Sequence, residues 1–169
     1  MSGLNITIES HDLKALDQAW EQIPELVQDE LTAATWEAEM LLLREIKEDT
    51  PVGATSNLRQ SIHAQAPVHH HQAVEGILGT SALHALPVEM GTRPHFPPVE
   101  PLIDWVQAKL DIRDESEAEA VAFSIARKIA ARGTKGQKMF HNNFHELKPT
   151  IEQIYGRAHQ NILEGLANG

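Results

Sequence analysis

An apolar stripe between two prolines constrains this chain more than any other feature. After Pro24, apolar residues recur at spacings of three and four, as on one face of a helix: Val27, Leu31, Ala34, Ala38, Leu42 and Ile46. Pro24 begins a new helix or kinks a continuous one, and the helix ends before Pro51. The pattern predicts that residues 11–49 are helical, with Ser10 or Asp12 as the cap.

Short strand patterns flank this helix. Residues 4–8 alternate apolar and polar side chains, which predicts a half-buried strand. Residues 58–65, 73–80 and 83–90 predict three further strands in an antiparallel meander. Four prolines within residues 91–101 predict an extended loop, because proline denies a sheet its amide donors.

The C-terminal half reads as helical. Residues 100–110 predict a short helix, and residues 114–131 predict a second whose acidic start and basic end suit the helix dipole. Residues 133–136 predict a flexible loop, and a last helix is expected to begin near Pro149. The 169 residues therefore predict a single α+β domain, in which residues 98–169 are largely a helical extension.

Composition excludes several functional classes. The chain has no cysteine, which rules out disulfides, thiolate metal sites and a cysteine nucleophile. A net charge of −10 disfavours nucleic acid and anionic membranes as partners of the whole molecule. No apolar run is long enough to span a bilayer and the first residues lack the pattern of a signal peptide, so we expect a soluble protein that stays where it is made.

Basic residues gather in one segment, where only Glu146 opposes them: Arg127, Lys128, Arg132, Lys135, Lys138 and Lys148. Such a run is typical of a solvated helix end, and it is also compatible with a contact surface. Among the aromatic residues, Trp20 and Trp36 are expected in helix packing. Trp105 lies beside the proline-rich loop, where it is either a local staple or half of an interface anchor.

No catalytic constellation emerges. His69–His71 reads as a polar loop with adventitious metal affinity as the alternative, and His141 and His145 share a helical face without the general base of a zinc protease. The carboxylate pair Glu37 and Glu39 lies in an acidic helical run, where solvated surface is the default. We expect no enzyme activity, no cofactor, no metal and no small-molecule substrate.

Three segments carry a family resemblance. Residues 50–62 read TPVGATSNLRQSI, residues 88–98 read VEMGTRPHFPP, and residues 125–136 read IARKIAARGTKG, followed by Met139-Phe140. With Trp105, this set resembles the small tail-component proteins, tail-completion or neck proteins, of long-tailed bacteriophages and prophages. The positions that match the family pattern are Pro51, Gly53, Leu58, Ser61, Glu89, Gly91, Thr92, Pro94, Trp105, Gly133 and Phe140.

The resemblance implies a non-enzymatic virion component that forms a ring at the head–tail junction. Its partners would be further copies of itself and neighbouring tail or connector proteins, in the bacterial cytoplasm during assembly and then in the virion. Candidate interface residues lie in the proline-rich loop and the basic segment: Arg93, His95, Phe96, Pro97, Pro98, Arg127, Lys128, Arg132, Lys135 and Lys138. The basic segment could alternatively touch DNA loosely in a channel.

Two alternatives stay open. Within the same class, the chain could be a tail terminator or a head–tail stopper. From another class, it could be a metal-dependent hydrolase or nuclease that uses the histidines. A small regulatory binding module is not supported, because the basic segment lacks a recognition-helix pattern.

Overall fold

The computed structural model describes residues 4–9, 24–53, 55–70 and 73–168, which fall into two compact units. The α2–α7 unit takes in Leu4–Asp49, Ile62–Thr80 and Phe140–Gly169. The α5–α6 unit takes in Thr50–Ser61 and Ser81–Met139. The predicted α+β class is confirmed: a long helix and a small antiparallel sheet precede a helical C-terminal half.

Helix α2 (Pro24–Asp49) confirms the predicted helix from its proline onward. Every member of the apolar stripe is buried. Trp36, however, is 43% exposed, so its predicted place in helix packing is wrong. Trp36 lies two positions from both Ala34 and Ala38, and that spacing rotates its side chain to the opposite face of the helix. Ser10, Asp12 and Trp20 lie outside the described residues.

The main sheet is organised around strand β4 (Ala73–Thr80). All six residues of strand β1 (Leu4–Glu9) pair antiparallel with β4, from Leu4 opposite Thr80 to Glu9 opposite Glu75. On the other edge, β2 (Ile62–Ala64) and β3 (Val68–His70) pair with successive halves of β4. The predicted strands at residues 4–8 and 73–80 are thus confirmed.

Two predicted strands are wrong wholly or in part. Residues 83–90 form helix α4 (Ala85–Met90), and α3 (Asn57–Ser61) replaces the first half of the strand expected at 58–65. Pro87 explains the first error, because a proline in the first turn of a helix removes no intrahelical hydrogen bond. In α3 the Ser61 hydroxyl donates to the Leu58 carbonyl at 2.8 Å. The predicted three-strand meander is therefore not formed.

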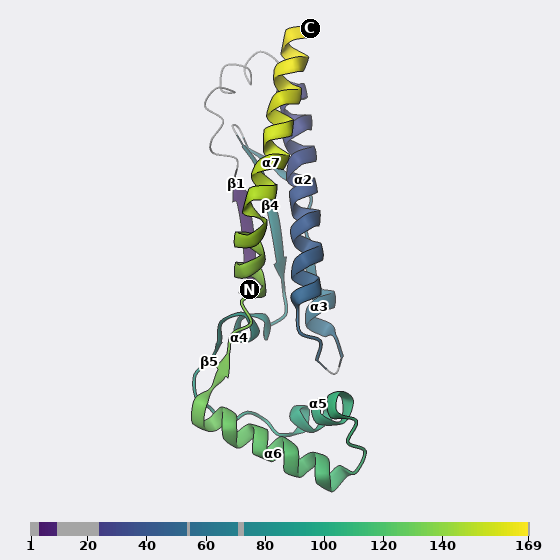
Figure 1. The fold of residues 1–169 in the computed structure, drawn as a ribbon, viewed down its shortest axis with the longest axis vertical. Coiled ribbons are helices and arrows are strands. Elements are labelled where there is room, and N and C mark those ends of the chain that lie inside the picture. The colour runs from purple at the N-terminus through teal and green to yellow at the C-terminus, as the bar shows by residue number, and fades with distance from the viewer. Residues whose placement is uncertain (1–3, 10–23, 54, 71–72, 169) are drawn as a thin grey trace. The chain divides into compact units, whose positions relative to one another are not determined.

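Helix α7 (Met139–Asn168) begins ten residues before Pro149, so the predicted start near that proline is wrong. The missing Pro149 amide leaves the His145 carbonyl without its usual donor. Both residues are exposed, and water can satisfy that carbonyl. The helix runs antiparallel to α2, since Asn143 bonds to Asp49 while Asn161 bonds to Glu30 near the other end (Figure 1).

The core of the α2–α7 unit lies between these two helices and the sheet. Val27 and Leu31 of α2, Val74 of β4 and Ile162 of α7 form one buried cluster, with Tyr155 and Leu166 packed against it. Burying four such aliphatic side chains stabilises the unit by roughly 1.5–3 kcal/mol each. The unit therefore has two layers, a pair of helices on one sheet.

The α5–α6 unit is built on a helical hairpin. Helices α5 (Glu100–Leu110) and α6 (Glu115–Arg132) confirm the predicted helices and pack through Val106, Ala118 and Ala122. Asp114 caps α6 by accepting a hydrogen bond from the Glu117 amide at 2.8 Å. Strands β5 (Gly91–Thr92) and β6 (Thr134–Lys135) form a short antiparallel pair, so the predicted loop at 133–136 contains a strand.

Candidate functional site

Residues of all three motif segments lie in the α5–α6 unit, whereas Ile62 at the end of the first segment and Phe140 after the third belong to the α2–α7 unit. The first segment forms one wall of a hollow of about 270 Å³, which His84, Val88 and Trp105 complete. In this segment Pro51 and Gly53 are exposed, whereas Leu58 is buried. Arg59 donates to the Thr50 carbonyl at 3.1 Å, and this bond ties the turn to the start of the segment.

The second and third segments are joined by backbone contacts. Gly91 pairs with Lys135 and Thr92 with Thr134, and the two threonine hydroxyls lie 3.0 Å apart. Beyond the strands, the Gln137 amide donates to the Val88 carbonyl at 2.8 Å and the Lys138 amide to the Glu89 carbonyl at 3.0 Å. The backbone between residues 88 and 92 is therefore held along its length by residues 134–138.

Glycine is required where these segments cross. Gly91 and Gly133 have φ angles of 79° and 68°, which side chains rarely adopt. A Cβ on Gly136 would lie 2.4 Å from the Glu89 carbonyl oxygen. These close approaches give a physical reason for the spacing of Glu-x-Gly-Thr in one segment and Gly-Thr-Lys-Gly in the other.

The predicted interface residues of the proline-rich loop are on the surface. Arg93, Pro94, His95 and Pro98 are exposed and Pro97 is half-buried. The His95 ring nitrogen Nδ1 lies 2.9 Å from the Arg93 carbonyl oxygen, and it donates in the tautomer that carries its proton there. Phe96 is 54% exposed, and its ring meets Phe123 of α6 edge-on at 5.9 Å. The loop thus contacts α6 through an aromatic pair, and both rings of that pair remain partly exposed to solvent.

Trp105 serves as a wall of the hollow rather than as a fully buried staple. Its side chain is 36% exposed, and it lies across from the Pro51–Leu58 turn. An indole with one open edge can pack locally and also meet a partner. Glu89 and Phe140, two other motif positions, are both buried.

The basic residues form an exposed surface at the C-terminal end of α6. Arg127, Lys128 and Arg132 lie on the helix, and Lys135 and Lys138 follow in and after β6. Because β6 pairs with β5, Arg93 directly after β5 comes to the same region. The opposite end of α6 carries Glu115, Glu117 and Glu119, all exposed. The helix is therefore strongly polarised in charge.

The described histidines do not gather into a cluster of metal ligands. His69 and His70 are exposed on β3, and His70 lies 2.7 Å from a Glu75 carboxylate oxygen. His141 and His145 share one face of α7 as predicted, with ring centroids 4.4 Å apart. His71 lies outside the described residues. Among residues that the structure describes, no group of three or more His, Cys, Asp or Glu side chains could hold a metal ion.

A buried carboxyl was missed by the sequence analysis. The prediction of Glu39 as solvated surface is wrong. Its side chain, on α2, is fully buried against Gly76 of β4. Burial raises the pKa of Glu39 to about 7, and the Ile77 backbone only partly opposes this. Within the described residues, no donor lies at the distance and angle of a well-formed hydrogen bond to either carboxyl oxygen of Glu39.

Two hydroxyls lie beside this carboxyl. The Tyr155 hydroxyl lies 2.9 Å from Thr35 Oγ1, and Thr35 itself donates to the Leu31 carbonyl at 2.7 Å. Burial raises the pKa of Tyr155, the hydrogen bond with Thr35 opposes the rise, and the charge of Glu39 adds to it. The burial could have been predicted from the sequence, because Thr35 and Glu39 are four positions apart and each directly adjoins a residue of the apolar stripe.

None of the described helices has the length and apolar character needed to cross a membrane. No protein-family model, no curated protein and no solved structure matches the chain.

Proposed function

We propose that this chain is a non-enzymatic structural component of a bacteriophage or prophage particle, acting in tail completion or at the neck. Copies of it assemble as a ring at the head–tail junction. The observation that carries this proposal is that residues of all three motif segments lie in one unit. Segments far apart in the sequence contact one another there, which supports treating them as one set of motifs.

Exposed apolar side chains in the same unit support an assembly role. Large hydrophobic residues there are between 48% and 89% exposed: Leu83, Leu86, Met90, Phe96, Leu110 and Phe123. Contiguous exposed apolar surface commonly marks a protein–protein contact. A proline-rich loop is already extended, so docking it against a neighbour costs little ordering entropy.

The test is complementation of a lysogen that lacks this gene. The variant Arg93→Ala/Phe96→Ala/Trp105→Ala should restore few infectious particles, because it removes the loop cation and both aromatic rings from the surface. Trp36→Ala is the matched control, since Trp36 is a similarly exposed indole in the other unit and should complement fully. If the triple variant complements as well as the wild type, this surface is not used in assembly.

The basic surface supports a second role within the same proposal, loose contact with DNA in a channel. Phosphate contacts made by exposed lysine and arginine are independent of sequence, which suits a conduit. Charge reversal at Arg132, Lys135 and Lys138 should then reduce DNA retention in assembled particles. Normal assembly and normal DNA retention would show that these residues contact neither DNA nor a neighbouring subunit.

A further inference from the structure

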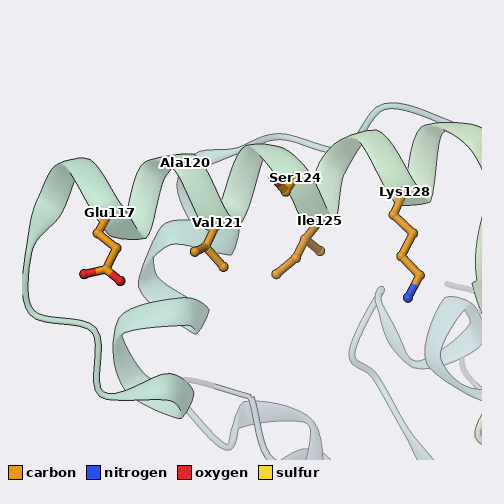
Figure 2. Close-up of a pocket in the computed structure, with 6 residues that line it drawn as sticks. All are labelled: Glu117, Ala120, Val121, Ser124, Ile125 and Lys128. Atoms are coloured by element: carbon orange, nitrogen blue, oxygen red, sulfur yellow. The ribbon is translucent and has the colours of Figure 1, made fainter.

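A shallow groove follows one face of helix α6. It has a volume of about 410 Å³ and is lined by Glu117, Ala120, Val121, Ser124, Ile125 and Lys128. Figure 2 shows Glu117, Val121, Ile125 and Lys128 projecting from the same side of the helix, with the two charged residues at the ends of the row. Glu117 and Lys128 are eleven positions apart, a distance of about 16 Å along the helix axis.

The centre of the groove is suited to close approach by another helix. Ala120 and Ser124 are small and exposed, whereas Val121 and Ile125 are half-buried and pack on the α5–α6 core with part of their surface. Small residues beside branched apolar ones make alternating hollows and knobs, which favour interlocking of two helices.

The lining residues match a second copy of themselves when the two helices run antiparallel. In that arrangement Glu117 of one copy faces Lys128 of the other, and each interface contains this pair twice. The same alignment places Ala120 opposite Ile125 and Val121 opposite Ser124, so every large side chain meets a small one. Within the described part of the chain, neither Glu117 nor Lys128 has an ion-pair partner.

We propose that this groove is the contact between two copies of the chain, related by a two-fold axis, with their α6 helices antiparallel. An isologous contact of this kind closes after two subunits. It is distinct from the head-to-tail contacts of a ring, and it does not rest on the proposed function. One helix pair is a small interface, so the dimer is weak and dependent on concentration and salt.

Sedimentation equilibrium of the purified chain over a wide range of concentration tests the contact. The wild type should reach a dimer, and the dimer should weaken at high salt. Glu117→Lys and Lys128→Glu should each weaken it at least tenfold, because each places like charges opposite one another twice. The double variant Glu117→Lys/Lys128→Glu should restore it. An equimolar mixture of the two single variants should form a heterodimer, since all of their facing charges are then opposite.

Glu119→Lys is the matched control. Glu119 is an exposed acidic residue of the same helix outside the groove, so its reversal should leave the dimer unchanged. Circular dichroism checks that each variant stays folded. A wild type that is monomeric at every concentration overturns the proposal, as does a double variant without rescue. A ring-sized oligomer sensitive to the same charges overturns the two-fold arrangement in favour of head-to-tail contact. None of these outcomes bears on whether particles need the gene.

Discussion

A Cβ atom built on Gly133 would lie 2.0 Å from the carbonyl oxygen of Thr92, closer than any real contact permits. Gly133 also has a positive φ of 68°. The close approach joins the residue after α6 to the last residue of β5. Two motif segments that lie about 40 residues apart in the sequence therefore depend on the absence of one side chain.

Gly133→Ala should lower the free energy of unfolding by at least about 2 kcal/mol, since the substitution combines a steric clash with an unfavourable backbone conformation. Chemical denaturation measures the loss. Gly53→Ala is the control, because nothing lies within 4 Å of the Cβ position there and its φ is ordinary. Equal stability of the two variants would contradict the described crossing of the segments.

Glu39→Gln should change how stability depends on pH. The pKa of Glu39 is raised from 4.5 to about 7 in the folded chain. Between these values the unfolded chain releases the proton while the folded chain keeps it, so the free energy of unfolding falls as pH rises through this window. The full loss is at most about 3 kcal/mol, and it is constant above the folded pKa.

The variant cannot ionise at this position and should lack that part of the decline. Denaturation at pH values from 4 to about 8 compares it with the wild type, and the difference between the two curves removes the contribution of the histidines. Parallel curves would mean that Glu39 titrates normally. Glu37→Gln, at a neighbouring exposed carboxylate of the same helix, serves as the control.

Thr35 and Tyr155 should be energetically coupled. Since the Thr35 hydroxyl donates to the Leu31 carbonyl, the Tyr155 hydroxyl donates to Thr35 across the 2.9 Å contact. Thr35→Val and Tyr155→Phe should each cost about 1 kcal/mol of stability. A double-mutant cycle should yield a coupling free energy of about 0.5 kcal/mol or more. Purely additive losses would show that the two hydroxyls do not interact.

The purified protein should retain no stoichiometric metal after dialysis. His141 and His145 form a pair on one helix, and no group of three or more His, Cys, Asp or Glu side chains among the described residues could hold a metal ion. Elemental analysis after dialysis against buffer without chelator measures this directly. A tightly held zinc or manganese ion, lost in His141→Ala/His145→Ala, would instead favour the hydrolase or nuclease alternative.

The sequence predicted the elements whose signal is periodic and long. The stripe from Val27 to Ile46 correctly predicts a buried helical face, and the acidic-to-basic run correctly predicts helix α6. The sequence-based prediction failed at two prolines. Pro149 was expected to begin a helix that in fact starts at Met139, and Pro87 was overlooked as a residue compatible with the first turn of α4.

The candidate surface was only partly predictable. Sequence reasoning correctly placed Arg93, His95 and Phe96 in an exposed loop, although the first two residues of the predicted loop, Gly91–Thr92, form strand β5. It gave no indication that Phe96 would meet Phe123, or that Trp105 would face the Pro51–Leu58 turn. Such contacts depend on tertiary packing between segments far apart in sequence, which local periodicity does not encode.

Electron microscopy of particles from a lysogen that lacks this gene tests the central claim most directly. The account predicts filled heads separated from tails, with joined particles restored by the wild-type gene supplied in trans. Joined, infectious particles at the normal yield in the absence of the gene would contradict a role at the head–tail junction.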